Sequence, residues 1–167
     1  MRLEYSQLLS AQLDASGDFA NKRSIVEKGI LSLEQGNMEP LLDIYTDDAI
    51  TQMSGLPPSK PTRESKSRFF SWLINANESM DFSRNLKSTI LKCFWLVALV
   101  NVDGDKVFVQ FQLTFKLKDG TSHKVDFNAN HIKDKGSDKL TRSDVTGDVS
   151  TVLPLWVKHT GQIPTEW

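Results

Sequence analysis

Two neighbouring carboxylates, Asp47 and Asp48, are of a type and spacing that could carry out chemistry. They lie in LLDIYTDDAITQMSGLPP, residues 41–58, where an apolar helical pattern runs into a short extended segment and a turn. Two carboxylates could act as a general acid and a general base. Alternatively, they end the helix and order the turn, because Asp side chains bond readily to nearby backbone N–H groups.

His131 is the second candidate for chemistry. It alternates with Phe127 and Ala129 in a segment with a period of two, so these side chains share one face of the expected strand. An unperturbed imidazole titrates at about pH 6.5, which suits a general acid or base near neutral pH. The alternative is a strand-end histidine that is solvated or hydrogen-bonded to a neighbour and takes no part in a reaction.

Other reactive groups give no recognisable constellation. The histidines at 123, 131 and 159 lack paired spacing and Cys93 is the single cysteine, so no structural zinc site is expected. Cys93 has mostly apolar neighbours, which disfavour a reactive thiolate. The sequence lacks GxxxxGK[ST] and a GxGxxG after a strand, the motifs that cradle nucleotide phosphates. We therefore expect any activity to need no cofactor.

The length and composition limit the kinds of protein that this chain can be. A chain of 167 residues fits one domain, 1–167, with a core large enough to need no disulfide. Lys and Arg number 20 against 21 Asp and Glu, which leaves no basic footprint for nucleic acid. The longest apolar run, CFWLVALV, is too short to span a membrane. The acidic N-terminus does not read as a signal peptide, and we expect a cytosolic protein.

Helical patterns dominate the first half of the chain. An opening helix within residues 1–20 is expected to act as a flap, closed by DASGD at 14–18. A second helix runs from Ser24 until Gly36 stops it, and a third follows from Asn37 to the TDD segment, with Tyr45 at its end. The fourth helix begins after Thr62, a suitable N-cap, and ends near residue 77.

The second half changes to a period of two. Residues 88–102, 106–118, 121–133 and 138–148 are predicted strands, separated by the turn signals DGD, KDG and KGSD. In KVFVQFQLTFKLK the odd positions are all apolar and the even ones largely polar. Helices followed by an antiparallel meander predict an α+β fold with the helices on one side of the sheet.

The order of these elements resembles the nuclear transport factor 2-like superfamily, which includes ketosteroid isomerases, SnoaL-like polyketide cyclases, dehydratases and epoxide hydrolases. LEQGNMEPLLDIYTDDAI, TRESKSRFF and DKLTRSDVTGD are similar to its motifs, between Ile30 and Asp148. The resemblance implies a cone, in which a curved sheet wraps around helices and encloses a deep apolar pocket. Asp47 and Asp48 match an acidic pair found in catalytic and non-catalytic members, which favours their structural role.

The catalytic groups of these relatives have no counterpart here. The carboxylate base of the isomerases corresponds to Met53, their oxyanion-hole tyrosine to Gly29 and their protonated aspartate to Ala129. The aspartate base of the SnoaL-like cyclases corresponds to Val145. Any catalysis must therefore use other side chains, and His131 is the expected acid or base.

The turn KDG at residues 118–120 decides which side chains join His131 in the pocket. A two-residue turn places Gln110 and Gln112 on the face of Ala129 and Phe127, and a bulge reverses this. We expect the two-residue turn, which leaves the apolar odd face to be covered by a second subunit in a homodimer.

Two function classes follow from this sequence. One is an isomerase, cyclase or dehydratase acting on a small hydrophobic metabolite, with His131 as acid or base and Tyr45 or Gln112 orienting an oxygen. The other is a non-catalytic module that binds a ligand or dimerises. The tail, 149–167, should pack over the pocket mouth or on a partner. The residues expected to line the pocket are Met53, Phe70, Trp95, Gln110, Phe127, Ala129 and Val145.

Overall fold

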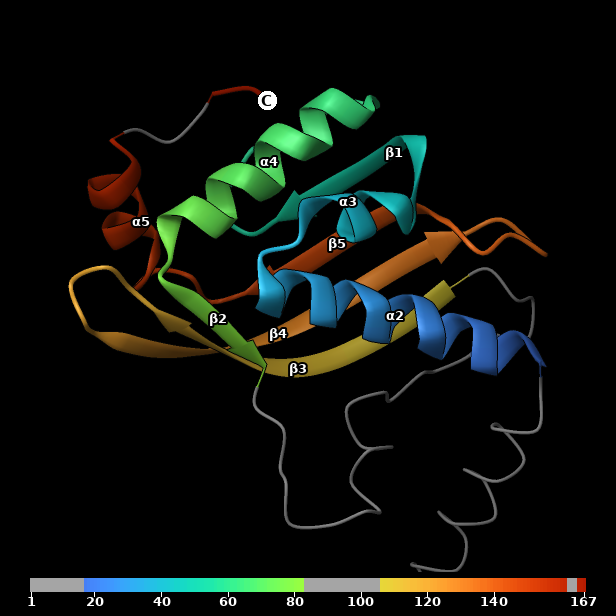
Figure 1. Cartoon of the computed structure of the whole chain (residues 1–167), viewed down its shortest axis with the longest axis horizontal. Helices are drawn as coiled ribbons and strands as arrows, with labels where there is room; N and C mark the ends of the chain where they lie inside the picture. The colour runs from blue at the N-terminus through green and yellow to red at the C-terminus, as the bar shows by residue number, and fades with distance from the viewer. Residues whose placement is uncertain (1–16, 83–105, 162–164) are drawn as a thin grey trace, which may run out of the picture.

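A computed structural model describes residues 17–82, 106–161 and 165–167 of the chain. The described part forms a curled five-stranded sheet with helices against one face (Figure 1). The helices are α2 (Gly17–Gln35), α3 (Met38–Asp43), α4 (Arg63–Ala76) and α5 (Leu153–Thr160). The strands are β1 (Tyr45–Met53), β2 (Ser79–Phe82), β3 (Lys106–Lys116), β4 (Ser122–Lys133) and β5 (Leu140–Gly147).

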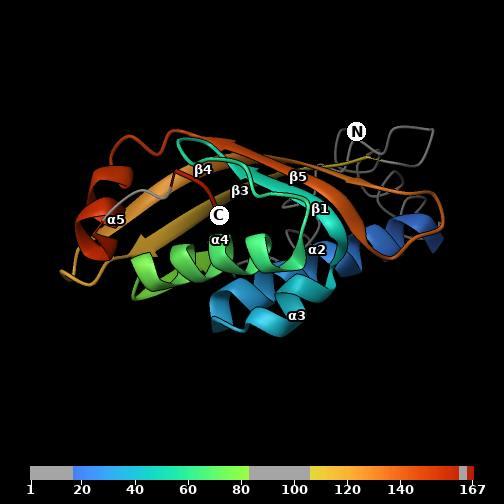
Figure 2. The ribbon, with the colours of Figure 1, turned by 90° about the horizontal axis from the view of Figure 1, so that it is seen from above.

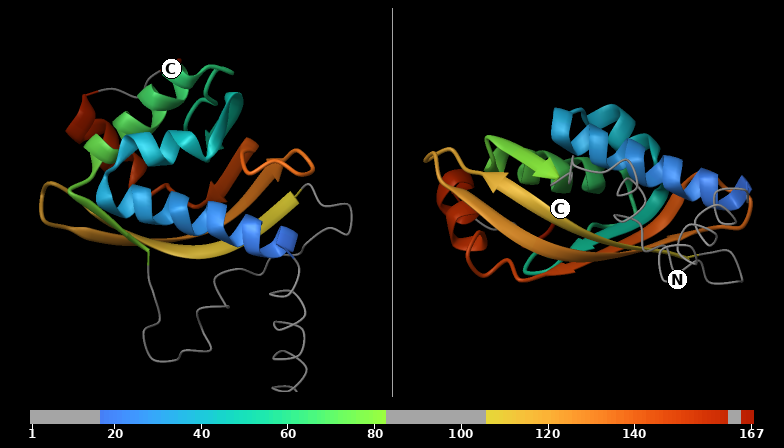
Figure 3. Two further views of the ribbon diagram at one scale, coloured as in Figure 1. Left: turned by 45° about the vertical axis from the view of Figure 1, so that its right-hand side comes forward. Right: turned by 90° about the horizontal axis from the view of Figure 1, so that it is seen from below.

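The strands lie in the order β1-β5-β4-β3-β2. Every neighbouring pair is antiparallel except β1 and β5, which are parallel. Helices α2, α3 and α4 all cover the same face of the sheet (Figure 2), and β3 and β4 bend around them (Figure 3). The predicted α+β cone, with helices packed on a curved and mostly antiparallel sheet, is confirmed.

The boundaries of the first two described helices follow local signals only in part. Helix α2 begins at Gly17, inside the segment predicted to break a helix, and runs on through Ser24 to Gln35. Gly36 follows with φ +62°, a conformation that glycine adopts without strain, and the chain turns there into α3. Helix α3 ends at Asp43, so the predicted placement of Tyr45 at a helix end is wrong.

Helix α4 matches its prediction closely. The side-chain oxygen of Thr62 accepts a hydrogen bond from Ser65 N at 3.1 Å and so caps the helix N-terminus. Asn77 follows the last helical residue, and its side-chain nitrogen donates to Leu73 O at 2.8 Å. The apolar side of α4 is buried, with Phe69 and Phe70 at most 5% exposed.

Asp47 and Asp48 lie within strand β1, whereas the sequence predicted them at the end of the preceding helix. The pairing of β1 with β5 is irregular between Tyr45 and Ile50, and the exposed Asp47 and Asp48 lie in this irregular part. The buried ammonium of Lys66 donates to Asp47 O at 2.5 Å and to Ala49 O at 3.1 Å. The backbone around the pair is therefore held by a side chain of α4, and the two carboxylates stand outside the core.

The hairpin between β3 and β4 has three residues at its tip instead of two. Leu117 N donates to Thr121 O at 2.9 Å, which leaves 118–120 as the loop. Gly120 has φ +84°, as the last residue of a three-residue loop with a bulge requires. One extra residue shifts the pairing by one position and exchanges the two faces of the strand.

The exchange of faces overturns the expected register. Phe111 lies opposite Phe127, and their rings stack with centroids 5.4 Å apart, so the odd face of β3 points inward. The prediction that Gln110 and Gln112 share a face with the pocket is wrong. The odd face is covered by the chain's own helices, so it cannot serve as the proposed dimer surface. The homodimer itself stays a prediction.

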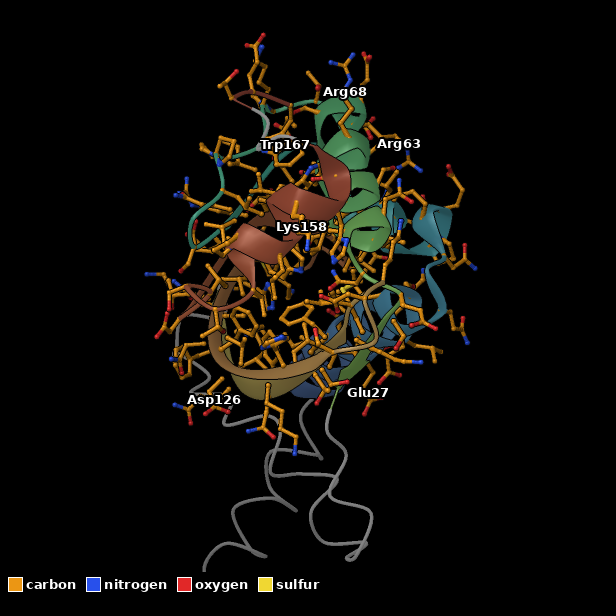
Figure 4. The ribbon with its side chains drawn as sticks, turned by 90° about the vertical axis from the view of Figure 1, so that its left-hand side faces the viewer. Glu27, Arg63, Arg68, Asp126, Lys158 and Trp167 are labelled. Atoms are coloured by element: carbon orange, nitrogen blue, oxygen red, sulfur yellow. The ribbon has the colours of Figure 1, made fainter. Side chains whose placement is uncertain are left out.

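Gln110 and Gln112 lie on the outer face, where each pairs across to β4. The Gln110 amide donates to Asn128 Oδ1 at 2.9 Å, and the Gln112 amide donates to Asp126 Oδ1 at 3.0 Å. Figure 4 shows Asp126 pointing away from the helices, on the convex side of the sheet. The outer face of these two strands is therefore polar.

The tail forms a short helix that closes one end of the core. Trp156 of α5 is fully buried, with its ring centroid 4.9 Å from that of Phe115, and its Nε1 donates to Asn77 Oδ1 at 2.9 Å. The ring of Trp167 packs against that of Phe69 at 5.1 Å. These contacts explain why the tail is rich in large apolar side chains.

Some predictions fall on parts of the chain outside the described residues. They are the strand at 88–102, which includes Trp95, and most of the flap helix within 1–20. The last residues of that segment, 17–20, belong to α2.

Replacing Lys66 by Met should destabilise the protein by about 1–3 kcal/mol, because buried carbonyl oxygens of β1 lose their donor. The pKa of Lys66 is lowered by burial and partly restored by Asp47 and Asp48. Urea unfolding at pH 7 measures the change. The control is Lys60→Met: Lys60 is 56% exposed and pairs with Glu166 at the surface, so we expect less than about 0.5 kcal/mol. Equal stability of the Lys66→Met variant and wild type would contradict the anchoring role.

Candidate functional site

A cavity of about 90 Å³ lies between the sheet and helices α2, α3 and α4. Its lining is mostly aliphatic and aromatic, and the described residues that form it include no Asp, Glu, Lys or Arg. An apolar hollow with few polar groups is typical of a site for a small ligand. The lining residues that matter below are Gly29, Tyr45, Met53, Phe70, Ala129, His131, Ser143 and Val145.

Three polar side chains of the lining form a hydrogen-bonded chain. His131 Nδ1 lies 2.7 Å from Ser143 Oγ, and Ser143 Oγ lies 3.2 Å from Tyr45 Oη. Tyr45 and Ser143 are buried, at 5% and 2% exposed. The remaining hydroxyl of the lining, that of Thr51, is bonded at 3.2 Å to Ser59. The chain of His131, Ser143 and Tyr45 is thus the polar centre of the cavity.

Strand β5 brings these three groups together because it lies between β4 and β1. His131 and Ser143 are directly opposed in the antiparallel pair of β4 and β5, where side chains on the same face are neighbours. Tyr45 begins β1, on the other side of β5. Ser143, on the inward face of β5, therefore lies between a residue of β4 and a residue of β1.

Burial keeps the two titratable members of the chain uncharged. It lowers the pKa of His131 to about 4, although the carboxylate of Asp144 acts in the opposite direction. It raises the pKa of Tyr45 to about 12, partly offset by the hydrogen bond from Ser143. At pH 7 the site therefore contains a neutral imidazole and a neutral phenol.

Two arrangements of the protons satisfy these contacts, and they differ in which way Ser143 donates. Ser143 has one hydroxyl proton, and the bond to Tyr45 uses it when Ser143 donates. His131 Nδ1 must then carry a proton to donate to Ser143 Oγ, which leaves a lone pair on Nε2. The phenol proton of Tyr45 is also unused within the chain. In this arrangement the three side chains leave one proton acceptor, His131 Nε2, and one proton donor, the phenol of Tyr45.

Six of the ten residues proposed for the site, either as acting groups or as lining, do line the cavity. They are Tyr45, Met53, Phe70, Ala129, His131 and Val145. Phe127 packs in the core beside it, Gln110 and Gln112 lie on the outer face, and Trp95 is outside the described residues. The roles assigned to these side chains stay predictions.

Sequence reasoning missed Ser143. A signal was present, because Ser143 precedes Val145 by two residues on a predicted strand and must share its face. The residue type itself gave no signal, because serine does not titrate near neutral pH and marks no known motif here. Its importance lies in its two partners, which are distant in the sequence.

Gly29, which the resemblance matched to the oxyanion-hole tyrosine of the isomerases, lines the cavity from α2. A Cβ atom there would stand 2.9 Å from Cδ1 of Ile44, the end of a side chain that can shift to make room. Glycine inside a helix costs about 1 kcal/mol relative to alanine. The phenol of this cavity comes instead from Tyr45.

Two further properties bear on partners. Among the residues that the structure describes, no helix is both long and apolar enough to span a membrane. Within the same ranges, no group of three or more His, Cys, Asp or Glu side chains is arranged to hold a metal ion.

Lowering the pH from 7 to about 4.5 should destabilise the wild type more than a His131→Gln variant. The folded pKa of His131, about 4, lies below the ordinary 6.5, so in this window the unfolded chain binds a proton that the folded protein does not. The contribution is fully present above the ordinary pKa and is lost as the pH falls toward 4. Urea unfolding at both pH values measures it. An equal loss in both proteins would contradict a lowered pKa of His131.

No family model and no curated protein matches this sequence. Solved structures do match the fold. One is a pinacolase from Penicillium brevicompactum, at 10% identity and a TM-score of 0.65, covering 87% of this chain and 94% of that one. Another is a nuclear transport factor 2-like protein from Burkholderia xenovorans, at 15% identity and a TM-score of 0.58, covering 81% and 95%.

A third similar structure is a ketosteroid isomerase-like protein from Erwinia carotovora atroseptica. It has 12% identity and a TM-score of 0.55, and the alignment covers 75% of this chain and 92% of that one. Identities this low establish architecture and leave activity open. Together with the curled sheet and its helices, they show that this chain has the cone-shaped nuclear transport factor 2-like fold.

Proposed function

We propose that this protein is a cofactor-independent enzyme that moves a proton on a small apolar molecule held in the cavity. Isomerisation, cyclisation and dehydration are reactions of this kind. The observation that supports it best is the chain from His131 through Ser143 to Tyr45 at the polar centre of an otherwise apolar cavity. Proteins of this fold described as a pinacolase and a ketosteroid isomerase-like protein are consistent with it.

Each polar group has a distinct role in this proposal. His131 Nε2 is the base that takes a proton from carbon, and the phenol of Tyr45 donates to the oxygen on which charge develops. A neutral histidine accepts a proton, whereas an imidazolium cannot, so its lowered pKa keeps it in the required form at neutral pH. We assign Met53, Phe70, Ala129 and Val145 to contacts with the apolar part of the substrate.

The substrate should carry no charge. A carboxylate or phosphate in this cavity would lose its hydration and find no basic side chain among the described lining residues. Carbonyl compounds fit better, because a carbonyl oxygen accepts one hydrogen bond from Tyr45 and acidifies the neighbouring C–H bonds. We therefore propose small uncharged ketones or enones as the substrate class.

Exchange of carbon-bound hydrogen in D₂O is a test that does not require the natural substrate to be known. The purified protein is incubated with a panel of monocyclic and bicyclic ketones and enones, and deuterium uptake is followed by mass spectrometry. We expect uptake above the buffer rate for at least one compound. His131→Ala should lower that rate at least ~100-fold, the lower end for a lost general acid or base. Circular dichroism checks that the variant is folded.

The matched control is His123→Ala. His123 lies on the same strand, near its start, and its Nε2 bonds at 3.2 Å to the hydroxyl of Thr121. It does not line the cavity, so its loss should leave the exchange rate unchanged. Undiminished exchange in His131→Ala would remove His131 from the mechanism. Saturable binding of the panel compounds with neither exchange nor isomerisation would instead support a non-catalytic ligand-binding module.

A further inference from the structure

We propose that Ser143 relays a proton from His131 to Tyr45, so that one step removes a proton from the substrate carbon and delivers another to its oxygen. The inference rests on the proposed function and adds a third participant to it. Ser143 would then be part of the catalytic path, although it need not touch the substrate.

The geometry singles out Ser143 because, among the described residues, it connects the other two groups. Its Oγ lies 2.7 Å from His131 Nδ1 and 3.2 Å from Tyr45 Oη. A hydroxyl group can accept one proton while it donates another, which a carboxylate or an ammonium group cannot do. At 2% exposed, the serine has no bulk water to compete for either bond.

The proton transfers balance without a further reactant. His131 Nε2 accepts the proton from the substrate carbon, and Nδ1 passes its own proton to Ser143 Oγ. Ser143 passes its hydroxyl proton to Tyr45 Oη, and Tyr45 passes its phenol proton to the substrate oxygen. The electron pair of the broken C–H bond forms the C=C bond, and the carbonyl π pair becomes the new O–H bond. A ketone becomes an enol, and every side chain remains neutral.

After this step the hydrogen bonds among the three side chains run in the opposite direction. His131 now carries its proton on Nε2, Ser143 donates to Nδ1, and Tyr45 donates to Ser143. Run in reverse, the same relay returns a proton from Nε2 to carbon and takes the enol proton back to Tyr45. If the proton returns to a different carbon of a conjugated substrate, the product is a positional isomer and the resting arrangement is restored.

Burial gives a physical reason for a relay that leaves no charge. A transfer to His131 alone would form an imidazolium where desolvation lowers its pKa, and one from Tyr45 alone would form a phenolate where desolvation raises its pKa. Separated charges are costly in an apolar cavity whose described lining has no charged residue to offset them. Moving both protons together avoids both ions.

The discriminating variants are Ser143→Ala and Ser143→Thr. Alanine removes the hydroxyl and breaks the relay, and threonine keeps a hydroxyl and suits a strand position. In the D₂O exchange assay we expect Ser143→Ala to lose about 100-fold and Ser143→Thr to stay within about tenfold of wild type. Tyr45→Phe, which removes the terminal donor, should lower the rate to a similar extent as Ser143→Ala.

A second readout uses the protein without substrate. Long-range ¹H–¹⁵N correlation spectra of histidine-labelled protein at pH 7 report which ring nitrogen carries the proton, and His131→Gln identifies the signals. We expect the Nδ1–H tautomer in wild type and in Ser143→Thr. In Ser143→Ala, where Nδ1 loses its partner, the population should shift toward the Nε2–H tautomer.

Each result has a defined meaning. An Nε2–H tautomer in the resting wild type would overturn the relay, because Nε2 could not accept a proton. Equal exchange in Ser143→Ala and wild type would overturn the relay and leave the proposed function standing. Equal losses in the Ala and Thr variants with an unchanged tautomer would reduce Ser143 to a positioning residue. A wild type that neither exchanges hydrogen in the panel compounds nor isomerises them would overturn the function and the relay together.

Discussion

The register of the β3 and β4 pair decides which side chains meet inside this protein. The three-residue loop at 118–120 turns the odd face of β3 toward the helices, with Phe111 against Phe127. On the same inward face of β4, His131 follows Phe127 by four residues. A loop one residue shorter would put glutamine amides inside and phenylalanines outside, so the apolar cavity depends on the length of one turn.

Polar groups in an apolar interior are tolerated when they form hydrogen bonds with one another. His131, Ser143 and Tyr45 do so in a chain that spans three neighbouring strands, and burial holds the histidine and the tyrosine neutral. The same condition limits what the site can accept. A neutral guest with one oxygen can join the chain, whereas a charged guest would need a partner that the described lining does not provide.

Much of the architecture was predictable because its signals are local. The cap at Thr62, the end of α4 at Asn77, the period of two in the second half and the helices before the sheet all reflect short-range preferences. Helix and strand boundaries that depend on tertiary contacts were harder to predict from the sequence. Tyr45 opens a strand instead of closing a helix, because β1 pairs with β5, which is distant in the sequence.

The sequence by itself determined the fold class, the order of the long helices and of strands β3, β4 and β5, and the identity of His131 and Tyr45 as candidate polar groups. The tertiary structure alone decided which face is inside and which third residue joins them. Ser143 is separated by 12 residues from His131 and by 98 from Tyr45. No local preference encodes contacts of that range, which arise only when strand β5 pairs with β4 on one side and β1 on the other.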